Sequence, residues 1–362
     1  MSALYSVLIA DPIHAAGRDI LDSDARIRAD VETGLDEEAL IARIDDYDAL
    51  IVRSKTKVTK PVIDAASRLR AIGRAGIGFD NIDIPSATER GIVVFNTPDA
   101  NATTTAELSI AHLMSLSRNL PQADRAVRDG EWKPARYSGV ELSGKTVGVV
   151  GFGTIGRLVA ERCAALKMRV LAYDPFVAPQ IMSDHGAEGT DLEGLLANAD
   201  YVTLHCPLSE KTRHLLDAAR LASMKPGARI INCARGGLVD EAALLDALQS
   251  GHLAGAALDV YETEPPAGSP LLALDNIVLT PHLGASTEEA QQAVSLRIAE
   301  DMVKFLTTGA AETAVNLPRV TADQLTQTGP YQSLAYSLGR LVGALCEGPI
   351  SQLDVHLYGR VT

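Results

Sequence analysis

The stretch from Lys145 to Asp174 joins two apolar, strand-like segments through a glycine-rich turn and a helical segment. Its first segment, residues 145–150, is short and rich in β-branched residues, which is typical of a buried parallel strand. The turn reads Gly151-Phe152-Gly153-Thr154-Ile155-Gly156, and Asp174 ends the second strand 18 residues after Gly156. This pattern predicts a βαβ unit that carries a G-x-G-x-x-G motif.

Each glycine of this motif has a distinct physical role. Gly151 permits a tight turn, Gly153 lets the backbone approach a pyrophosphate, and Gly156 lets helix and strand pack closely. The helix N-terminus then offers free N–H groups and the positive end of its dipole. Asp174 can bind the ribose hydroxyls of NAD and would repel the 2′-phosphate of NADP. A glycine-rich turn alone is common, but the flanking strands, helix and acid favour NAD binding, with Thr154 and Ile155 also at the cofactor.

Length and composition exclude several classes of protein. The chain has 362 residues, of which 46% are hydrophobic and 22% charged, and this suits a globular protein of two domains and part of a third. A net charge of −13 argues against nucleic acid or an anionic membrane as partner. We expect no membrane span and no signal peptide. The four cysteines lack metal-ligand spacing, so we expect no metal and a cytoplasmic protein with reduced thiols.

The first 98 residues alternate short apolar strands with helical segments, which predicts a parallel α/β sheet. Two strands end at cations: one at Arg53-Ser54-Lys55, and one at Arg74, beside Gly76, Ile77 and Gly78. Ligands collect at the carboxyl ends of parallel strands, so these cations form a candidate anion clamp. Solvated surface charge is the alternative, and the glycines beside Arg74 favour the clamp.

A second region follows a break near Pro98. Residues 117–144 look polar and irregular, like a linker or a protruding arm, and Trp132 within it is either an interface anchor or part of a small local core. From Lys145 onward we count six strands, the number in the doubly wound dinucleotide fold. A long helix over about 286–308 is expected to return the chain to the first domain. Beyond it, leucines at helical spacing precede a strand-like segment at 350–358.

Three polar residues lie at or just beyond the carboxyl ends of consecutive strands: Arg235, Glu264 and His282. Arginine suits bidentate capture of a carboxylate, histidine is a proton donor or acceptor near neutral pH, and Glu264 would orient His282 and favour its charged form. Oxidation of a 2-hydroxy acid requires this set. Taken singly, each of these residues is better explained as surface charge or as a packed side chain. Three of them at strand ends beside a dinucleotide motif favour a catalytic site. Asp259 is a candidate for the nicotinamide, whereas His205 is a weak catalytic candidate.

These motifs resemble those of the D-isomer-specific 2-hydroxyacid dehydrogenases. The resemblance rests on residues 151–156 with Asp174, Asn232 to Gly237, Ala256 to Val260 with Glu264-Pro265, and Pro281 to Ser286, and it covers about residues 5–318. It implies an α/β fold of two doubly wound parallel-sheet domains: a flavodoxin-like substrate domain at 1–98, completed by 287–316, and a Rossmann NAD domain at 99–286. Residues 317–362 would be a partial C-terminal extension, and we expect no serine feedback.

The resemblance also assigns residues to roles. Arg235, Glu264 and His282 would be the catalytic set, and the chain would form homodimers, or higher homo-oligomers, through the NAD domain and the arm around Trp132. The implied cofactor residues include those of the G-x-G-x-x-G fingerprint, Gly151, Gly153, Thr154, Ile155 and Gly156. The others are Ile77, Asp174, Thr203, Cys206, Pro207, Cys233, Ala234, Asp259, His282 and Gly284. The implied residues for a small anionic substrate are Arg53, Ser54, Lys55, Arg74, Gly76, Ile77, Arg235 and His282.

The resemblance implies 3-phospho-D-glycerate, oxidised to 3-phosphohydroxypyruvate on the way to serine, as the leading substrate, and the basic residues favour a phosphorylated acid. Glyoxylate, hydroxypyruvate or another 2-oxo acid is the close alternative. A binding module of the same fold that senses NADH, like the transcriptional corepressors of this family, is a further alternative.

Overall fold

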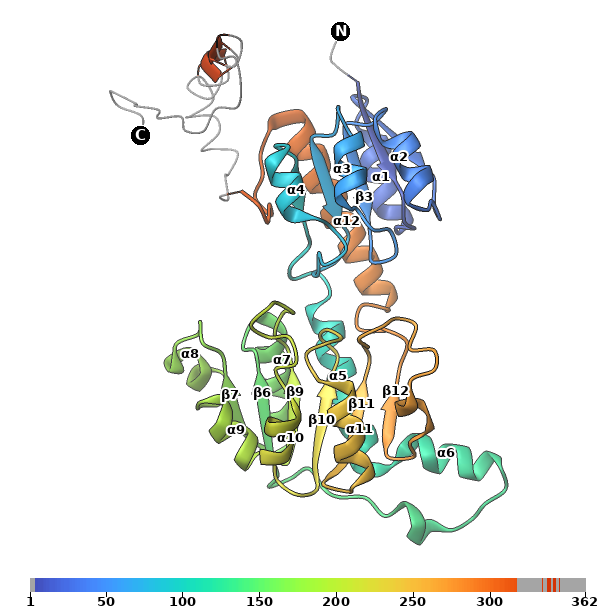
Figure 1. The fold of residues 1–362 in the computed structure, drawn as a ribbon, viewed down its shortest axis with the longest axis vertical. Helices are drawn as coiled ribbons and strands as arrows, with labels where there is room; N and C mark the ends of the chain where they lie inside the picture. The colour runs from blue at the N-terminus through green and yellow to red at the C-terminus, as the bar shows by residue number, and fades with distance from the viewer. Residues whose placement is uncertain (1–3, 318–333, 335–336, 340, 343–344, 346–362) are drawn as a thin grey trace. The chain divides into compact units, whose positions relative to one another are not determined.

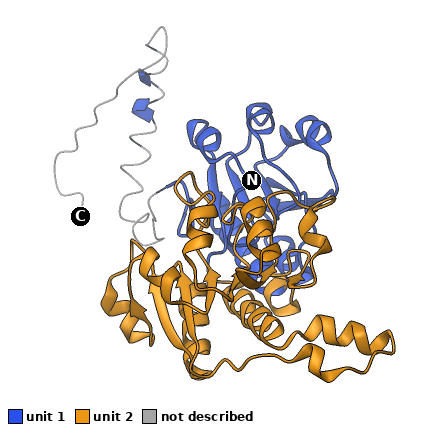
Figure 2. Cartoon of the chain, turned by 60° about the horizontal axis from the view of Figure 1, so that its bottom comes forward, with its two compact units in different colours: residues 1–98, 292–362 blue, residues 99–291 orange. Residues whose placement is uncertain are grey.

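The computed structural model describes residues 4–317 together with residues 334, 337–339, 341, 342 and 345 (Figure 1). The chain divides into two compact units, one of residues 1–98 and 292–362 and the other of residues 99–291 (Figure 2). The second boundary falls at 291/292, where the sequence suggested 286/287. The strand expected at 350–358 lies outside the described residues.

The first unit is built on a five-stranded parallel sheet with the order β2-β1-β3-β4-β5. This is the flavodoxin-like order, which confirms the fold class expected for this part of the chain. The edge strand β2 went unrecognised in the sequence, because polar residues interrupt it. The strands are β1 (Tyr5–Ile9), β2 (Ile27–Val31), β3 (Ala49–Val52), β4 (Ala71–Arg74) and β5 (Val93–Phe95).

Helices cover both faces of this sheet. One face packs against α2 (Glu37–Ile44), α3 (Lys60–Ala65) and α4 (Ile84–Glu89), whose leucine, isoleucine and valine side chains are buried there. The other face carries α1 (Ala15–Ser23) and the long α12 (Glu288–Thr308). Gly73 of β4 allows α12 to approach closely, because a Cβ atom at this position would lie 2.8 Å from Ile298. The helix near the end of the described chain therefore completes the unit that the N-terminus begins.

The second unit contains a seven-stranded parallel sheet with the order β12-β11-β10-β9-β6-β7-β8. The doubly wound arrangement is confirmed, but the expected count of six strands is wrong. The additional strand is β8, an edge strand of two residues that is too short to leave a periodic pattern. The strands are β6 (Thr146–Val150), β7 (Arg169–Tyr173), β8 (Glu188–Gly189), β9 (Tyr201–Leu204), β10 (Ala228–Asn232), β11 (Leu253–Leu258) and β12 (Ile277–Leu279).

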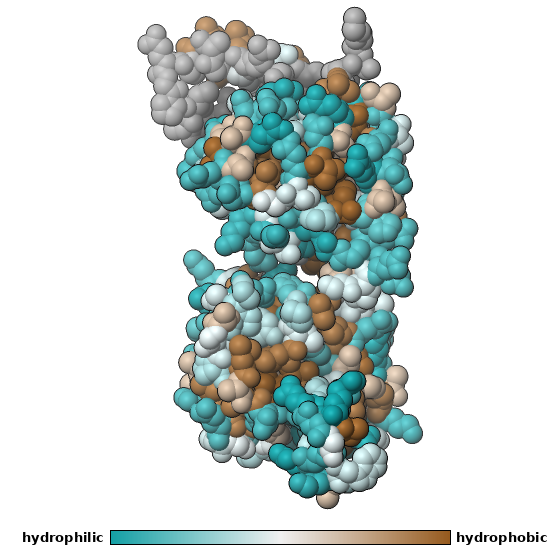
Figure 3. Space-filling view, turned by 90° about the vertical axis from the view of Figure 1, so that its right-hand side faces the viewer, coloured by the Kyte–Doolittle hydropathy of each residue, from teal (hydrophilic) through white to brown (hydrophobic). Residues whose placement is uncertain are grey.

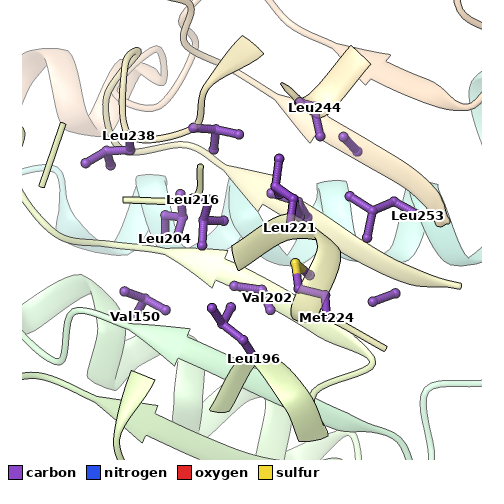
Figure 4. Close-up of a cluster of buried hydrophobic side chains, with 14 of the residues drawn as sticks. Val150, Leu196, Val202, Leu204, Leu216, Leu221, Met224, Leu238, Leu244 and Leu253 are labelled. Carbon is purple, nitrogen blue, oxygen red and sulfur yellow. The ribbon is translucent and has the colours of Figure 1, made fainter. Parts of the chain in front are cut away.

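Two layers of helices enclose this sheet. On one face α9 (Leu192–Asn198), α10 (Ala218–Ser223) and α11 (Glu241–Gln249) bury a cluster of leucine, valine and isoleucine side chains (Figure 4). On the other face, α5 (Ala102–Arg118), α7 (Thr154–Ala165) and α8 (Pro179–Asp184) bury a second cluster. Strands apolar on both sides are the reason for the continuous hydrophobic runs in the sequence.

The segment between α5 and β6 is more ordered than its sequence suggested. Residues 117–144, expected to be irregular, contain α6 (Leu120–Arg128) and a short 3₁₀ helix (Pro134–Tyr137), and a second 3₁₀ helix (Pro270–Ala273) precedes β12. Trp132 is 80% exposed, so within this chain it is not part of a local core. No helix in the described part of the chain has the length and apolarity needed to cross a membrane.

Candidate active site

The glycine-rich turn lies where the strand order of the second unit reverses, between β6 and β9. Gly151 has φ +92°, and a Cβ atom there would lie 2.6 Å from the carbonyl carbon of His205, which follows β9. A Cβ atom on Gly156 would lie 2.1 Å from the carbonyl oxygen of Gly151. These two glycines are therefore required by packing within the chain itself.

Gly153 differs, because a Cβ atom there would meet no atom within 4 Å. It caps the N-terminus of α7 without a side-chain hydrogen bond to the helix. The space in front of these N–H groups is thus kept clear, as an approaching pyrophosphate requires. The fingerprint fits a dinucleotide.

Asp174, at the end of β7, holds the loops on both sides of itself. Its Oδ2 accepts a hydrogen bond of 2.8 Å from the Phe152 N–H, and its Oδ1 accepts one of 2.9 Å from the Phe176 N–H. The carboxylate thus braces the fingerprint turn as well as lying where the sequence predicts the ribose. Thr154, also expected at the cofactor, places its hydroxyl 3.1 Å from Asp99 Oδ1.

His282 and Glu264 come together, although they follow different strands. His282 lies beyond β12 and Glu264 beyond β11, and their Nδ1 and Oε2 atoms are 2.8 Å apart. Both side chains are partly exposed. A carboxylate only accepts hydrogen bonds, so Nδ1 donates to Glu264 and Nε2 is the nitrogen that remains for a ligand.

Glu264 is fixed at its other oxygen too, which accepts a hydrogen bond of 3.2 Å from the Tyr261 N–H. Burial raises the pKa of Glu264, but the hydrogen bond from His282, the charges of His282 and Arg235 and the Tyr261 N–H outweigh it, so the pKa lies below its ordinary value. Glu264 is therefore a carboxylate at neutral pH.

Arg235 follows β10 in a loop that Asn232 ties together. The Asn232 side chain donates to the Arg235 carbonyl at 2.8 Å and accepts from the Ala234 N–H at 3.1 Å. Gly236 lies directly against the next loop, since a Cβ atom there would be 1.8 Å from the Tyr261 carbonyl oxygen. The loops that carry Arg235 and Glu264 are thus packed on each other.

Asp259 is fully buried, and the structure reveals a use of it that the sequence did not suggest. Its Oδ1 accepts from the Thr280 hydroxyl and the Leu283 N–H, each at 2.6 Å, and its Oδ2 accepts from the Gly284 N–H at 2.8 Å. Asp259 thereby anchors the turn after His282. A contact to nicotinamide stays a prediction.

His205, the weak catalytic candidate, and the cofactor candidates Cys206, Pro207 and Cys233 follow two adjacent strands at the same sheet edge. Desolvation lowers the pKa of His205 to about 3, and its Nε2 lies 2.8 Å from the Thr203 hydroxyl, so it is a neutral, locally bonded group. Cys206 and Pro207 follow it directly. Burial raises the pKa of Cys206 to about 11 and that of Cys233 to about 12, so both are thiols. In the described residues no three potential metal-ligating side chains gather.

In the first unit, the loop Arg53–Thr56 is held by two residues that sequence reasoning missed. Asp11 accepts from the Arg53 N–H at 2.7 Å and from the Thr56 hydroxyl at 2.9 Å, and the Asn81 amide donates to the Arg53 and Thr56 carbonyls at 2.7 Å each. Ser54 and Lys55 at the tip are exposed. Asp11 comes at the end of a buried strand, and this position could have identified it from the sequence.

Arg74 is the last residue of the neighbouring strand β4, and its side chain lies over Gly76. A Cβ atom on Gly76, whose φ is +149°, would lie 1.6 Å from Arg74 Nη1. The Asn96 amide donates to the Ile77 carbonyl at 2.7 Å and so ties this loop to β5. Because β3 and β4 are adjacent and parallel, the two cationic loops lie at the same edge of their sheet.

Comparison with known proteins identifies the group to which these features belong. Residues 110–284 match the family model described as D-isomer specific 2-hydroxyacid dehydrogenase, NAD binding domain. The chain is 44% identical over 99% of its length to D-3-phosphoglycerate dehydrogenase of Methanocaldococcus jannaschii and 46% identical over 98% to that of Synechocystis sp.. It spans 68% and 64% of these two relatives, about two thirds.

Solved structures agree with the sequence relatives. A glyoxylate reductase from Paecilomyes thermophila superimposes with a TM-score of 0.80 at 32% identity, covering 87% of this chain and 99% of the other. The predicted family, fold class and NAD cofactor are thereby confirmed. The chain belongs to the D-isomer specific 2-hydroxyacid dehydrogenases.

Proposed function

We propose that this NAD-dependent enzyme oxidises 3-phospho-D-glycerate to 3-phosphohydroxypyruvate, with Arg235, Glu264 and His282 as its catalytic residues. The observation that carries the proposal is the 2.8 Å pairing of His282 with Glu264 at the strand ends beside a dinucleotide fingerprint. The 44% identity to a D-3-phosphoglycerate dehydrogenase supports this choice of substrate.

In this proposal His282 moves the proton. Its Nδ1–H is donated to Glu264, so the bare Nε2 takes the proton of the substrate hydroxyl as the C2–H bond breaks. NAD, when bound at the fingerprint, would supply the acceptor for the hydride that leaves C2. Glu264, ionised at neutral pH, stabilises the imidazolium that forms and keeps the ring in one orientation. In the reverse reaction the same imidazolium protonates the developing alkoxide.

Arg235 binds the substrate carboxylate and the oxygen at C2. Its guanidinium offers parallel N–H donors in a planar fork, which matches a carboxylate better than an ammonium does. The hydrogen bonds between Asn232 and the Arg235 loop support this role, because they fix the backbone from which the side chain extends.

We assign the phosphate of the substrate to the cationic loops of the first unit, Arg53-Ser54-Lys55 and Arg74 to Ile77. Adjacent parallel strands and the bonds from Asp11 and Asn81 support this assignment. The chain has a net charge of −13, so a doubly charged phosphate needs such a local concentration of positive charge.

The second candidate is reduction of an unphosphorylated 2-oxo acid, and the likeness to a glyoxylate reductase favours it. Initial rates of NADH oxidation with 3-phosphohydroxypyruvate, hydroxypyruvate and glyoxylate distinguish the two. We expect kcat/KM for the phosphorylated acid to exceed the others by at least about 10²-fold, because each phosphate contact is a charge-assisted hydrogen bond. Preference for glyoxylate would overturn the proposed substrate but not the family.

A pair of charge-neutralising variants sharpens this test. Lys55→Gln should lower kcat/KM for 3-phosphohydroxypyruvate and leave that for hydroxypyruvate nearly unchanged. Lys304→Gln is the matched control: Lys304 is a partly exposed lysine of the same unit that pairs with Glu312. It lies next to Phe305, whose ring contacts Arg70 just before the start of β4, at the opposite edge of the sheet from the cationic loops. Equal effects of the two variants would mean that general electrostatic attraction, not a phosphate site, favours the substrate.

We further propose a division of labour and a homodimer. Residues 1–98 with the helix over 292–308 bind the substrate phosphate, and residues 99–291 bind NAD and carry the catalytic residues. Dimerisation through the arm is supported by the exposed apolar side chains of Leu120, Val127 and Trp132. Figure 3 faces the side where α6 lies in Figure 1 and shows hydrophobic surface among hydrophilic side chains. Light scattering should give the mass of two chains, and Trp132→Ala should reduce it.

A cytoplasmic location is also proposed. Cys163, Cys206 and Cys233 are all free thiols in the described part of the chain, as expected in a reducing compartment.

A further inference from the structure

A line of hydrogen bonds lies behind the turn that carries His282. Cys233 Sγ is 3.5 Å from His112 Nδ1, His112 Nε2 is 3.1 Å from Thr280 Oγ1, and Thr280 Oγ1 is 2.6 Å from Asp259 Oδ1. Cys233, Thr280 and Asp259 follow three adjacent strands, whereas His112 lies on α5. His112 is only 3% exposed and Asp259 is fully buried.

The chemistry of the four groups gives this line one direction. Both oxygens of Asp259 accept hydrogen bonds from backbone N–H groups, so the Thr280 hydroxyl donates to Asp259 and not the reverse. Thr280 Oγ1 must then accept from His112, which places the imidazole hydrogen on Nε2. Nδ1 is left as an acceptor for the Cys233 S–H group. Each assignment follows from the one before it.

The state of His112 agrees with this direction. Burial lowers the pKa of His112, and the charge of Asp259 opposes the effect only in part, so the imidazole is neutral. Cys233, whose pKa burial raises to about 12, keeps its proton. A neutral imidazole that donates through Nε2 and accepts through Nδ1 has both nitrogens satisfied.

The turn at the other end of the line needs support. His282 has φ +55°, the left-handed conformation that costs a non-glycine residue free energy and persists only where its surroundings hold it. Asp259 holds the two following N–H groups, of Leu283 and Gly284. Helix α5 also contacts the turn directly, because the Thr105 hydroxyl donates to the Gly284 carbonyl at 2.8 Å.

We propose that His112 is a positioning residue for the dehydrogenase reaction: as a fixed Nε2–H tautomer it orients the Thr280 hydroxyl, which orients Asp259 and so holds His282 against Glu264. This rests on the proposed role of His282 as the acid–base group. His112 touches neither substrate nor cofactor in this proposal, and its effect is transmitted through Thr280 and Asp259.

The tautomer can be tested without measuring activity. In ¹⁵N-labelled protein at about pH 7, with the His112 signals assigned from the spectrum of His112→Gln, we expect a protonated Nε2 and a bare Nδ1. An Nδ1–H tautomer, or an imidazolium at pH 7, would contradict the direction of the line and overturn the proposal.

The transmission to His282 is tested with Thr280→Val, which keeps the shape of the side chain but removes the hydroxyl, and Thr280→Ser, which keeps the hydroxyl. Thr280→Val should lower kcat by roughly 10-fold to 10²-fold, the range expected when a catalytic group is misplaced by up to an ångström. Thr280→Ser should retain most of the wild-type kcat. His112→Leu should resemble Thr280→Val, and His112→Gln, whose amide can donate to Thr280, should restore part of kcat.

If His112 only stabilised the fold, its replacement would impair NADH binding and kcat together. A positioning role lowers kcat alone. We therefore expect NADH dissociation constants within about two-fold of the wild type, since the fingerprint is untouched. Ser117→Ala is the matched control: Ser117 is a buried residue of the same helix, and its hydroxyl lies 2.8 Å from the Tyr201 hydroxyl. It should lower the melting temperature but not kcat.

The outcomes distinguish the two proposals. Wild-type protein without turnover on any 2-oxo acid would remove the role of His282, and the positioning role with it. Active wild-type protein with full kcat in Thr280→Val and His112→Leu would overturn the role of His112 alone.

Discussion

His282 Nδ1 lies 2.8 Å from Glu264 Oε2, and the two residues belong to loops that follow different strands, β12 and β11. The other oxygen of Glu264 accepts from the Tyr261 N–H, so the carboxylate cannot rotate without losing a bond. This arrangement fixes which nitrogen of His282 faces a ligand. Several measurements follow from it.

Replacement of His282 by alanine should remove the proton acceptor and little else. We expect kcat to fall by at least about 10²-fold, the usual contribution of a general acid–base group, with NADH binding nearly unchanged. His185→Ala is a matched control, because His185 Nδ1 pairs with Glu161 at 2.7 Å on the surface of the same unit. Steady-state rates and NADH fluorescence titrations measure both. Unchanged turnover in His282→Ala would mean that another group moves the proton.

The pKa of Glu264 should respond to the same substitution. In the wild type it lies below the ordinary value of about 4.3, because the contributions of His282, Tyr261 and Arg235 outweigh burial. In His282→Ala, Glu264 stays partly buried but loses the hydrogen bond and charge of His282, which are the main contributions that lower its pKa. The pKa of Glu264 should therefore rise. The ¹³C shift of the Glu264 carboxyl carbon, followed between pH 2 and 8 (about the range in which a carboxyl titrates), measures the change. A pKa that stays low would show that Arg235 and Tyr261 suffice.

The sign of the effect on stability follows from this shift. A carboxyl group whose pKa is lowered by folding stabilises the protein above its unfolded-state pKa, and that contribution is lost as the pH falls through the folded-state pKa. Glu264→Gln should therefore lower the free energy of unfolding more at pH 7 than at about pH 3. The difference should be small, since both side chains are partly exposed.

The fold could be predicted largely because buried parallel strands leave continuous apolar runs. The strands missed were β2 and β8, both at sheet edges, where one is interrupted by polar residues and the other has only two residues. Helix α6 was missed because it is short and mostly polar, with few apolar side chains among charged and polar residues and only Ala126 buried.

The candidate site was predictable where residues follow strands, since adjacent parallel strands end at one edge. Arg235, Glu264 and His282 could be grouped in this way. The anchoring of the His282 turn by Asp259 could not, because it depends on a side chain reaching backbone N–H groups 24 and 25 residues away. The role of His112 could not be predicted for the same reason: its contacts are to residues far away in the sequence, and the sequence shows it only as one residue of a helix.

The fingerprint glycines allow a test in which packing and ligand approach are separated. Gly156→Ala places a Cβ atom 2.1 Å from the Gly151 carbonyl oxygen, so α7 must shift, at a cost of about 1–3 kcal/mol in the free energy of unfolding. Gly153→Ala meets no atom within 4 Å and should leave stability unchanged while weakening NAD binding. Thermal denaturation and NADH titration measure the two effects. Normal NADH binding by Gly153→Ala would contradict the placement of the pyrophosphate.

Arg235→Lys tests the geometry of carboxylate binding. The variant keeps the positive charge but loses the planar fork, so we expect kcat/KM to fall by roughly 10²-fold or more, close to the effect of Arg235→Ala. NADH affinity should be retained in both. If Arg235→Lys keeps most of its kcat/KM, the charge alone matters and a bidentate contact is not made.

Asp174 should determine cofactor choice and also brace the fingerprint turn. Asp174→Ala removes the acceptor of the Phe152 and Phe176 N–H groups, so NAD binding should weaken; it also removes the charge that repels a 2′-phosphate, so NADP use should rise. The ratio of kcat/KM for NAD to that for NADP should fall in Asp174→Ala and in Asp174→Asn. Asp191→Asn, which alters the acidic cap of α9, is the matched control and should leave the ratio unchanged. If the Asp174 variants lose NAD activity without gaining NADP activity, the carboxylate serves only the turn, and other groups decide between the cofactors.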